Sequence, residues 1–103
     1  VYVDEEIKHE WSRIPHFYND FYVYQYATGL SAACYITSKI LSNEDNYVSK
    51  YLDFLKSGGR DFPVELLKIA DVDMNKEEVI NSAIDMFEKT INEFEILERE
   101  QYE

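Results

Sequence analysis

Residues 13–29, called the aromatic segment below, hold the side chains of this chain that could act on a substrate. The segment contains His16 and, within ten positions, six aromatic residues: Phe17, Tyr18, Phe21, Tyr22, Tyr24 and Tyr26. Four of the six carry a phenol hydroxyl, and a buried hydroxyl without a hydrogen-bond partner costs roughly 1–3 kcal/mol. An imidazole can exchange a proton near neutral pH, and a phenol can donate to a developing oxyanion. These residues are therefore typical of a polar cleft, with a tyrosine-rich interior as the alternative.

The spacing of the aromatic residues predicts two faces of a helix. Tyr22 and Tyr26 are four residues apart and share one face. A second face carries three residues with a four-three spacing: Phe17, Phe21 and Tyr24. We expect one face to pack against the protein while the other lines a cleft.

No other motif in the sequence forms a complete catalytic or metal site. His9 and Glu10 begin like an H-E-x-x-H zinc motif, but Arg13 stands where the second histidine belongs. We therefore predict no metal ligands in this chain and expect His9 to lie on the surface. Cys34 lies in an apolar stretch without a neighbouring basic residue to lower its pKa, so we expect a buried small residue.

The remaining polar motifs have structural explanations. Residues 57–60 lack the spacing and the Lys-Ser/Thr ending of a phosphate-binding loop. Asp71 and Asp73 flank Val72 without the other ligands of a calcium loop, so we expect turn and cap residues there.

The composition restricts the class of protein and its partners. The 103 residues suffice for one domain, and 21 acidic against 10 basic residues give a net charge of -11. Such a charge disfavours nucleic acid and anionic membranes as partners and favours cationic or neutral ligands. A single cysteine excludes an internal disulfide and is typical of a reducing, cytoplasmic location. No apolar run approaches the roughly 18 residues that span a bilayer, and the start at Val1 suggests a piece of a longer protein.

The periodicity of apolar residues predicts an all-α fold, a bundle of about four to five helices. Asp4 is expected to cap the first helix, a capping box at 42–45 to open the third, and residues 57–59 to end it. A second capping box at 75–78 is expected to open the last helix. The expected helices cover residues 4–11, 15 or 16 to 41, 44–56, 63–69, and 75 to the frayed C-terminus.

Two apolar features leave alternatives open. The small residues at 28–33 indicate either unusually close helix packing, which we favour, or a local kink at Gly29. The last helix carries five apolar residues spaced four, three, four and three apart: Ile80, Ile84, Phe87, Ile91 and Phe94. This α-helical seam favours core packing within the domain over a coiled coil with another subunit, because it lasts only two to three heptads.

The sequence also resembles a known family. The runs RIPHFY at 13–18 and FYVYQYATG at 21–29 are similar to the C-terminal signature of oligoendopeptidase F. The similarity continues through YLDFLKSGGRDFPVELLKIADVDM at 51–74 and so covers most of the chain. The resemblance implies the C-terminal part of a larger all-helical, cytosolic zinc metallopeptidase, related to thimet oligopeptidase, that cleaves short peptides in a deep channel.

The resemblance also implies roles for individual residues. In that family an H-E-x-x-H helix and a downstream glutamate hold zinc, and this chain has none of these ligands. Phe17, Phe21, Tyr22 and Tyr24 align with the family's Y-x-x-x-Y-Y-x-Y pattern, which makes Tyr24 the expected oxyanion donor. His16 is expected to act beside it. The expected substrate-binding residues are Tyr22, Tyr26 and Tyr18.

The sequence departs from the family pattern at two places. Asn19 and Asp20 replace a common Tyr-Asn pair and add a carboxylate near the cleft, whereas Asp71 replaces a common glycine and is expected to affect only a turn. We expect residues 1–103 to form one helical unit of the catalytic domain, inactive alone. Its expected partners are a short peptide and the rest of the peptidase, with self-association of the fragment as a further possibility.

A protein of another class would fit the same composition. The alternative is a stand-alone helical module whose aromatic groove binds a peptide or a partner helix. An H-E-x-x-H motif upstream in the same reading frame would favour the peptidase, and a start codon just before Val1 would favour the module.

Overall fold

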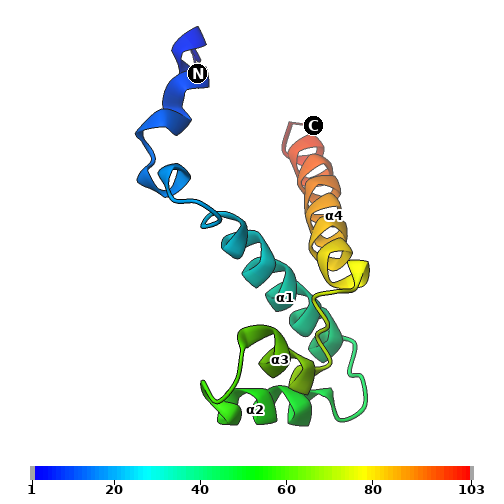
Figure 1. Ribbon diagram of the computed structural model, residues 1–103. Coiled ribbons are helices and arrows are strands. Elements are labelled where there is room, and N and C mark those ends of the chain that lie inside the picture. Colours follow the sequence, from blue (N-terminus) through cyan, green and yellow to red (C-terminus); the bar gives the residue numbers. More distant parts are fainter. Residues whose placement is uncertain (1, 103) are drawn as a thin grey trace.

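The computed structural model describes residues 2–102, and every regular element within them is a helix (Figure 1). Four α-helices and three 3-10 helices follow one another along the chain. They are η1 (Glu5–Arg13), η2 (Pro15–Tyr18), α1 (Tyr24–Leu41), α2 (Tyr47–Ser57), α3 (Pro63–Leu67), η3 (Lys68–Ala70) and α4 (Glu77–Tyr102). The predicted all-α fold is confirmed. None of the helices in residues 2–102 has the length and hydropathy of a bilayer-spanning segment.

The aromatic segment is not one continuous helix, contrary to the prediction. Pro15 opens only the short helix η2, Asn19 ends it in an extended conformation, and α1 begins eight or nine residues later than expected, at Tyr24. Phe21 has a φ of 55°, a left-handed conformation that costs an L-residue about 1–2 kcal/mol and breaks the helical path. The poor helix propensities of Asn19 and Asp20 contribute to this break.

The first and third helices also differ from their predicted type or bounds. Asp4 caps its helix as expected, accepting a hydrogen bond of 3.0 Å from the Glu6 amide, but residues 5–13 are a 3-10 helix. The capping box at 42–45 does not form. Asn43 and Asn46 adopt left-handed conformations, which asparagine tolerates, and they turn the chain so that α2 starts only at Tyr47.

Two predicted chain reversals are confirmed. Gly58 ends α2 with a φ of 59°, a conformation that glycine adopts without steric cost. Asp71 ends η3 in the left-handed region with a φ of 55°, where glycine and aspartate are both tolerated. The carboxylate of Asp73 accepts a hydrogen bond of 3.1 Å from the Asn75 amide just before α4, as a turn residue should.

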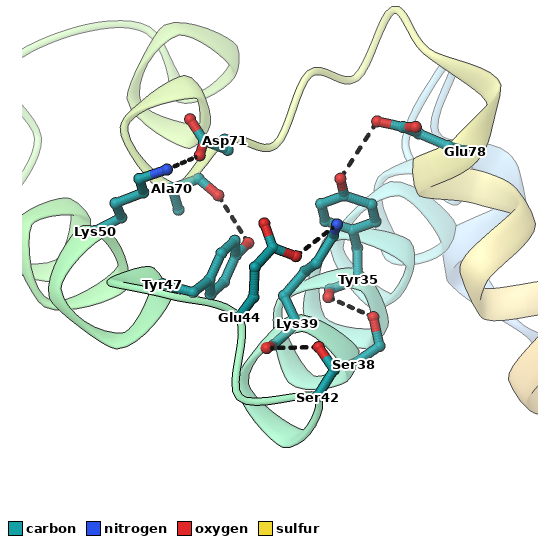
Figure 2. A network of polar contacts seen from close by, with 10 residues as sticks. All are labelled: Tyr35, Ser38, Lys39, Ser42, Glu44, Tyr47, Lys50, Ala70, Asp71 and Glu78. Carbon is teal, nitrogen blue, oxygen red and sulfur yellow. Dashed lines mark hydrogen bonds and ion pairs between the residues drawn. The ribbon is translucent and has the colours of Figure 1, made fainter.

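The core lies where α1, α2, η3 and the start of α4 meet. Its buried side chains are Ala32, Tyr35, Ile36, Tyr47, Ala70, Val72 and Val79. Polar contacts fasten the same region (Figure 2): the Tyr35 hydroxyl donates to Glu78 at 3.3 Å, and Lys50 pairs with Asp71. These contacts join α1 to α4 and α2 to the end of η3, so the long helices are fastened to each other and the short helices to each other.

The chain is much more extended than an independent domain of its size. Its radius of gyration is 18.3 Å, against about 13 Å for a compact chain of 100 residues. It exposes 8776 Å² of surface, against roughly 6,100 Å² for a folded monomer of this mass. In Figure 1, α1 and α4 diverge as the two arms of a V. The helices η1 and η2 extend away from the N-terminal end of α1.

Three packing predictions are therefore wrong. The apolar seam of α4 is 41–67% exposed, because the core contacts only the first turns of that helix, at Val79. Gly29 makes no close helix contact either, since an added Cβ would meet nothing within 4 Å. Cys34 is half-buried rather than buried.

Candidate functional site

The structure brings three of the predicted site residues together. His16, Tyr22 and Tyr26 form a cluster, called the His-Tyr cluster below. The His16 and Tyr22 rings stack with centroids 5.6 Å apart and planes 26° apart. Tyr26 meets His16 edge-on at 6.2 Å and Tyr22 edge-on at 5.7 Å. These separations are those of favourable aromatic pairs.

Three successive pieces of chain build this cluster. Helix η2 supplies His16, the turn after it supplies Tyr22, and the first turn of α1 supplies Tyr26. The Tyr22 amide donates to the Asn19 carbonyl at 3.3 Å, which closes the turn between η2 and α1. The predicted pairing of Tyr22 with Tyr26 is thus correct, although Tyr22 lies just outside α1.

A hydrogen bond between the Tyr22 and Tyr26 hydroxyls determines which of the two can donate to a ligand. The Tyr26 hydroxyl donates to the Tyr22 hydroxyl at 3.1 Å, and this bond raises the pKa of Tyr26. The Tyr22 hydroxyl, as the acceptor, keeps its own proton for another partner. The cluster can therefore present a neutral phenol donor beside an imidazole, which suits a peptide carbonyl.

Tyr24 lies apart from this cluster, beside a groove of about 580 Å³. On α1 it is two positions from Tyr26, a turn of about 200° around the helix. The groove, called the Tyr24 groove below, has one wall on α1 with Tyr24, Gln25, Thr28 and Gly29. The other lining residues are apolar and come from the segment before α3, from α3, and from around the start of α4: Phe62, Pro63, Val64, Leu67, Met74 and Ile80.

Tyr18 has a different environment again. Its hydroxyl donates to the Ser12 carbonyl at 2.6 Å, which ties η2 back to η1. Its ring stays exposed. The donor proton of Tyr18 is thus engaged within the chain, whereas its ring and its oxygen lone pairs remain accessible.

The candidate metal donors do not assemble into a site in the described part of the chain. No group of three or more His, Cys, Asp or Glu side chains that could hold a metal ion occurs among these residues. His9 lies on the surface as expected. The residues present therefore do not fit a zinc ion.

Sequence reasoning missed the Tyr24 groove. Its two walls lie more than 30 residues apart in the sequence, and the apolar residues at 62–64 follow no helical repeat that would predict a shared surface. The run of small residues at 28–33 was the one available signal, because Gly29 leaves open space on its face of α1.

Comparison with known proteins identifies the class. The sequence model described as Peptidase family M3 matches residues 1–86. The chain belongs to this peptidase family.

Within the family the chain is similar to oligoendopeptidase F. It is 52% identical over 95 residues to "Oligopeptidase PepF" of Bacillus subtilis, covering 92% of this chain and 14% of that protein. It is 42% identical over 92 residues to "Oligoendopeptidase F, plasmid" of Lactococcus lactis, covering 89% and 15%. The crystal structure of oligoendopeptidase-F from Enterococcus faecium superimposes with a TM-score of 0.82 at 50% identity, over 94% of this chain and 19% of that one. The predicted resemblance is confirmed, and the chain spans less than a fifth of each of these relatives.

Proposed function

We propose that this chain is the C-terminal substrate-cleft segment of a zinc-dependent oligoendopeptidase that hydrolyses peptide bonds in short peptides. Residues 1–103 would form one helical portion of its catalytic domain, in the cytoplasm. The observation that carries the proposal is the aromatic segment, which lies in the family-matched range and exposes several phenols beside an imidazole. The extended shape supports it, since 8776 Å² of surface leaves broad faces for the rest of an enzyme.

Each site residue has a role in this proposal. Tyr24, 58% exposed beside the groove, donates a hydrogen bond to the oxyanion that forms when the peptide carbonyl is attacked. His16 assists at the same carbonyl, and Tyr22, Tyr26 and Tyr18 hold the peptide. Phenols suit this work because a neutral hydroxyl donates only weakly to the neutral carbonyl of the substrate and more strongly to the oxyanion of the transition state.

Zinc, in this proposal, is held by residues of the whole enzyme outside this chain. When bound, it supplies an activated water for hydrolysis. The described residues contribute no ligand set for it. Their contribution is to bind and orient the peptide and to donate hydrogen bonds to its carbonyl groups.

The decisive experiment compares the isolated chain with a chimera. In the chimera, this chain replaces the matching segment of the Bacillus subtilis oligopeptidase, to which it is 52% identical. With zinc and a fluorescence-quenched oligopeptide, we expect turnover from the chimera and none from the isolated chain. Chelator-sensitive turnover by the isolated chain, or a folded chimera without activity, would contradict the proposal.

A second candidate function rests on the exposed apolar seam of α4. A free chain with this face uncovered could act as a helical interaction module or associate with itself. Sedimentation of the isolated chain separates these cases. A monomer that binds the remainder of the peptidase favours the enzyme segment, and a stable oligomer indifferent to that remainder favours the module.

A further inference from the structure

The ring of Tyr22 is held on two sides within the His-Tyr cluster. It stacks on His16 at 5.6 Å and meets Tyr26 edge-on at 5.7 Å. It is also less exposed than Tyr26, at 36% against 58%. A side chain that is ordered before a ligand arrives loses less entropy when it binds. The Tyr22 side chain is therefore prepared for a ligand by contacts inside the chain.

The backbone at Tyr22 supports its side chain less firmly than the backbone at Tyr26 does. Tyr22 lies in the turn before α1, directly after the left-handed Phe21, whereas Tyr26 lies in the first turn of α1. Groups on helices are held more precisely than groups on loops. The Tyr26 hydroxyl donates to the Tyr22 hydroxyl at 3.1 Å, and so ties the tip of a turn side chain to a regular helix.

The same bond fixes the direction in which Tyr22 can donate. A hydroxyl has one donor hydrogen and two acceptor lone pairs. The Tyr26 hydroxyl occupies one acceptor position of the Tyr22 oxygen, so the Tyr22 hydrogen points away from Tyr26. Hydrogen bonds in series also polarise one another, which strengthens the second donation. Within residues 2–102, the Tyr22 hydroxyl makes no hydrogen bond besides the one that it accepts, so its hydrogen is left for a group outside the chain.

We propose that Tyr26 is a positioning residue, which holds the peptide only through Tyr22, by aiming and polarising the Tyr22 hydroxyl toward a peptide carbonyl. The inference rests on the proposed peptidase function and divides the work between two tyrosines of the same site. Direct contact of Tyr26 with the peptide is the competing role, because its oxygen can still accept a hydrogen bond. The two roles differ in one measurable respect: a positioning residue has no effect once the residue that it positions has lost its function.

A double-mutant cycle in the active chimera measures this coupling. Tyr22→Phe, Tyr26→Phe and the double variant all keep the rings and remove only hydroxyls. A bond to a peptide carbonyl that does not react is equal in the ground state and the transition state, so its loss raises KM and leaves kcat unchanged. We expect KM to rise about tenfold in Tyr22→Phe, for one lost hydrogen bond, and about threefold in Tyr26→Phe, for lost ordering. The double variant should match Tyr22→Phe, whereas independent effects would multiply to about thirtyfold.

Tyr24→Phe provides the matched background for the cycle. In the part of the chain that the structure describes, no hydrogen bond engages the Tyr24 hydroxyl, so Tyr26 has no bond through which to act on it. Tyr26→Phe should therefore raise KM by the same factor of about three in this background, because uncoupled sites have additive effects. Loss of the Tyr26→Phe effect in this background too would show that the Tyr22 bond does not carry the coupling.

The remaining outcomes separate the inference from the proposed function. A folding defect in Tyr26→Phe lowers kcat in every background, so it does not imitate an effect on KM that disappears with the Tyr22 hydroxyl. Effects that multiply in the double variant, or an unchanged KM in Tyr26→Phe, overturn the positioning role alone. An inactive unsubstituted chimera instead overturns the proposed function and the inference with it.

Discussion

The hydroxyl of Tyr26 donates a hydrogen bond to the hydroxyl of Tyr22 at 3.1 Å, and the two rings meet edge-on at 87°. This bond joins the first turn of α1 to the irregular turn before it. The bond also makes the two phenols unequal. The Tyr26 hydroxyl is the donor, whereas the Tyr22 hydroxyl is the acceptor and can still donate to another group.

The pKa of Tyr26 should therefore depend on Tyr22. Donation to Tyr22 raises the pKa of Tyr26, since ionisation would destroy the bond. We expect Tyr22→Phe to lower the pKa of Tyr26 toward the ordinary value for tyrosine. NMR titration of ring-labelled tyrosine measures it, with Tyr24→Phe as the control. An unchanged titration of Tyr26 in Tyr22→Phe would show that the bond does not persist in solution.

Tyr24→Phe tests the oxyanion role in the active chimera. The loss of one oxyanion donor lowers kcat by about 10²–10³ and leaves KM almost unchanged, because the bond strengthens only in the transition state. Steady-state kinetics on a quenched peptide measures both constants. Tyr2→Phe is the control, since Tyr2 is exposed and lies outside the groove and the cluster. An unchanged kcat in Tyr24→Phe would move the role to another tyrosine.

Tyr47 should be the tyrosine most important for stability. It is 1% exposed, and its hydroxyl donates to the Ala70 carbonyl at 2.7 Å. Tyr47→Phe leaves that buried carbonyl without its partner, so the free energy of unfolding should fall by roughly 1–3 kcal/mol. Urea unfolding followed by circular dichroism measures the change. Tyr51→Phe, on the same helix and half-buried, should change it by less than about 0.5 kcal/mol.

The same buried phenol makes the fold sensitive to high pH. Burial raises the pKa of Tyr47 to about 12, whereas an unfolded tyrosine titrates near about 10. The contribution of Tyr47 to the free energy of unfolding is therefore complete below about pH 10. It is lost as the pH rises toward 12, because the tyrosine of the unfolded state releases its proton first.

The urea midpoint measured from pH 8 to 12 tests this dependence. We expect a loss of at most about 2–3 kcal/mol across the upper two pH units, from 1.36 kcal/mol for each unit of pKa difference. Tyr47→Phe should show a smaller fall over that interval. Equal slopes for the two proteins would assign the alkaline sensitivity to other groups.

Local sequence determined the helical class and several boundaries. Asp4 caps the first helix, Gly58 ends α2, and Tyr22 pairs with Tyr26, all as predicted. These features depend on residues within about four positions of one another, so helical periodicity and residue propensity suffice to predict them. The family was likewise legible in the sequence, because its signature is a contiguous run of residues at 13–29.

Only the tertiary structure decided which surfaces are covered and which residues meet. The start of α1 at Tyr24 depends on the left-handed conformation of Phe21, which no local pattern indicates. The seam of α4 has the periodicity of a core helix, but periodicity specifies a face and not its partner. The Tyr24 groove forms between α1 and residues 62–80, so it exists only once the chain has brought these distant segments together.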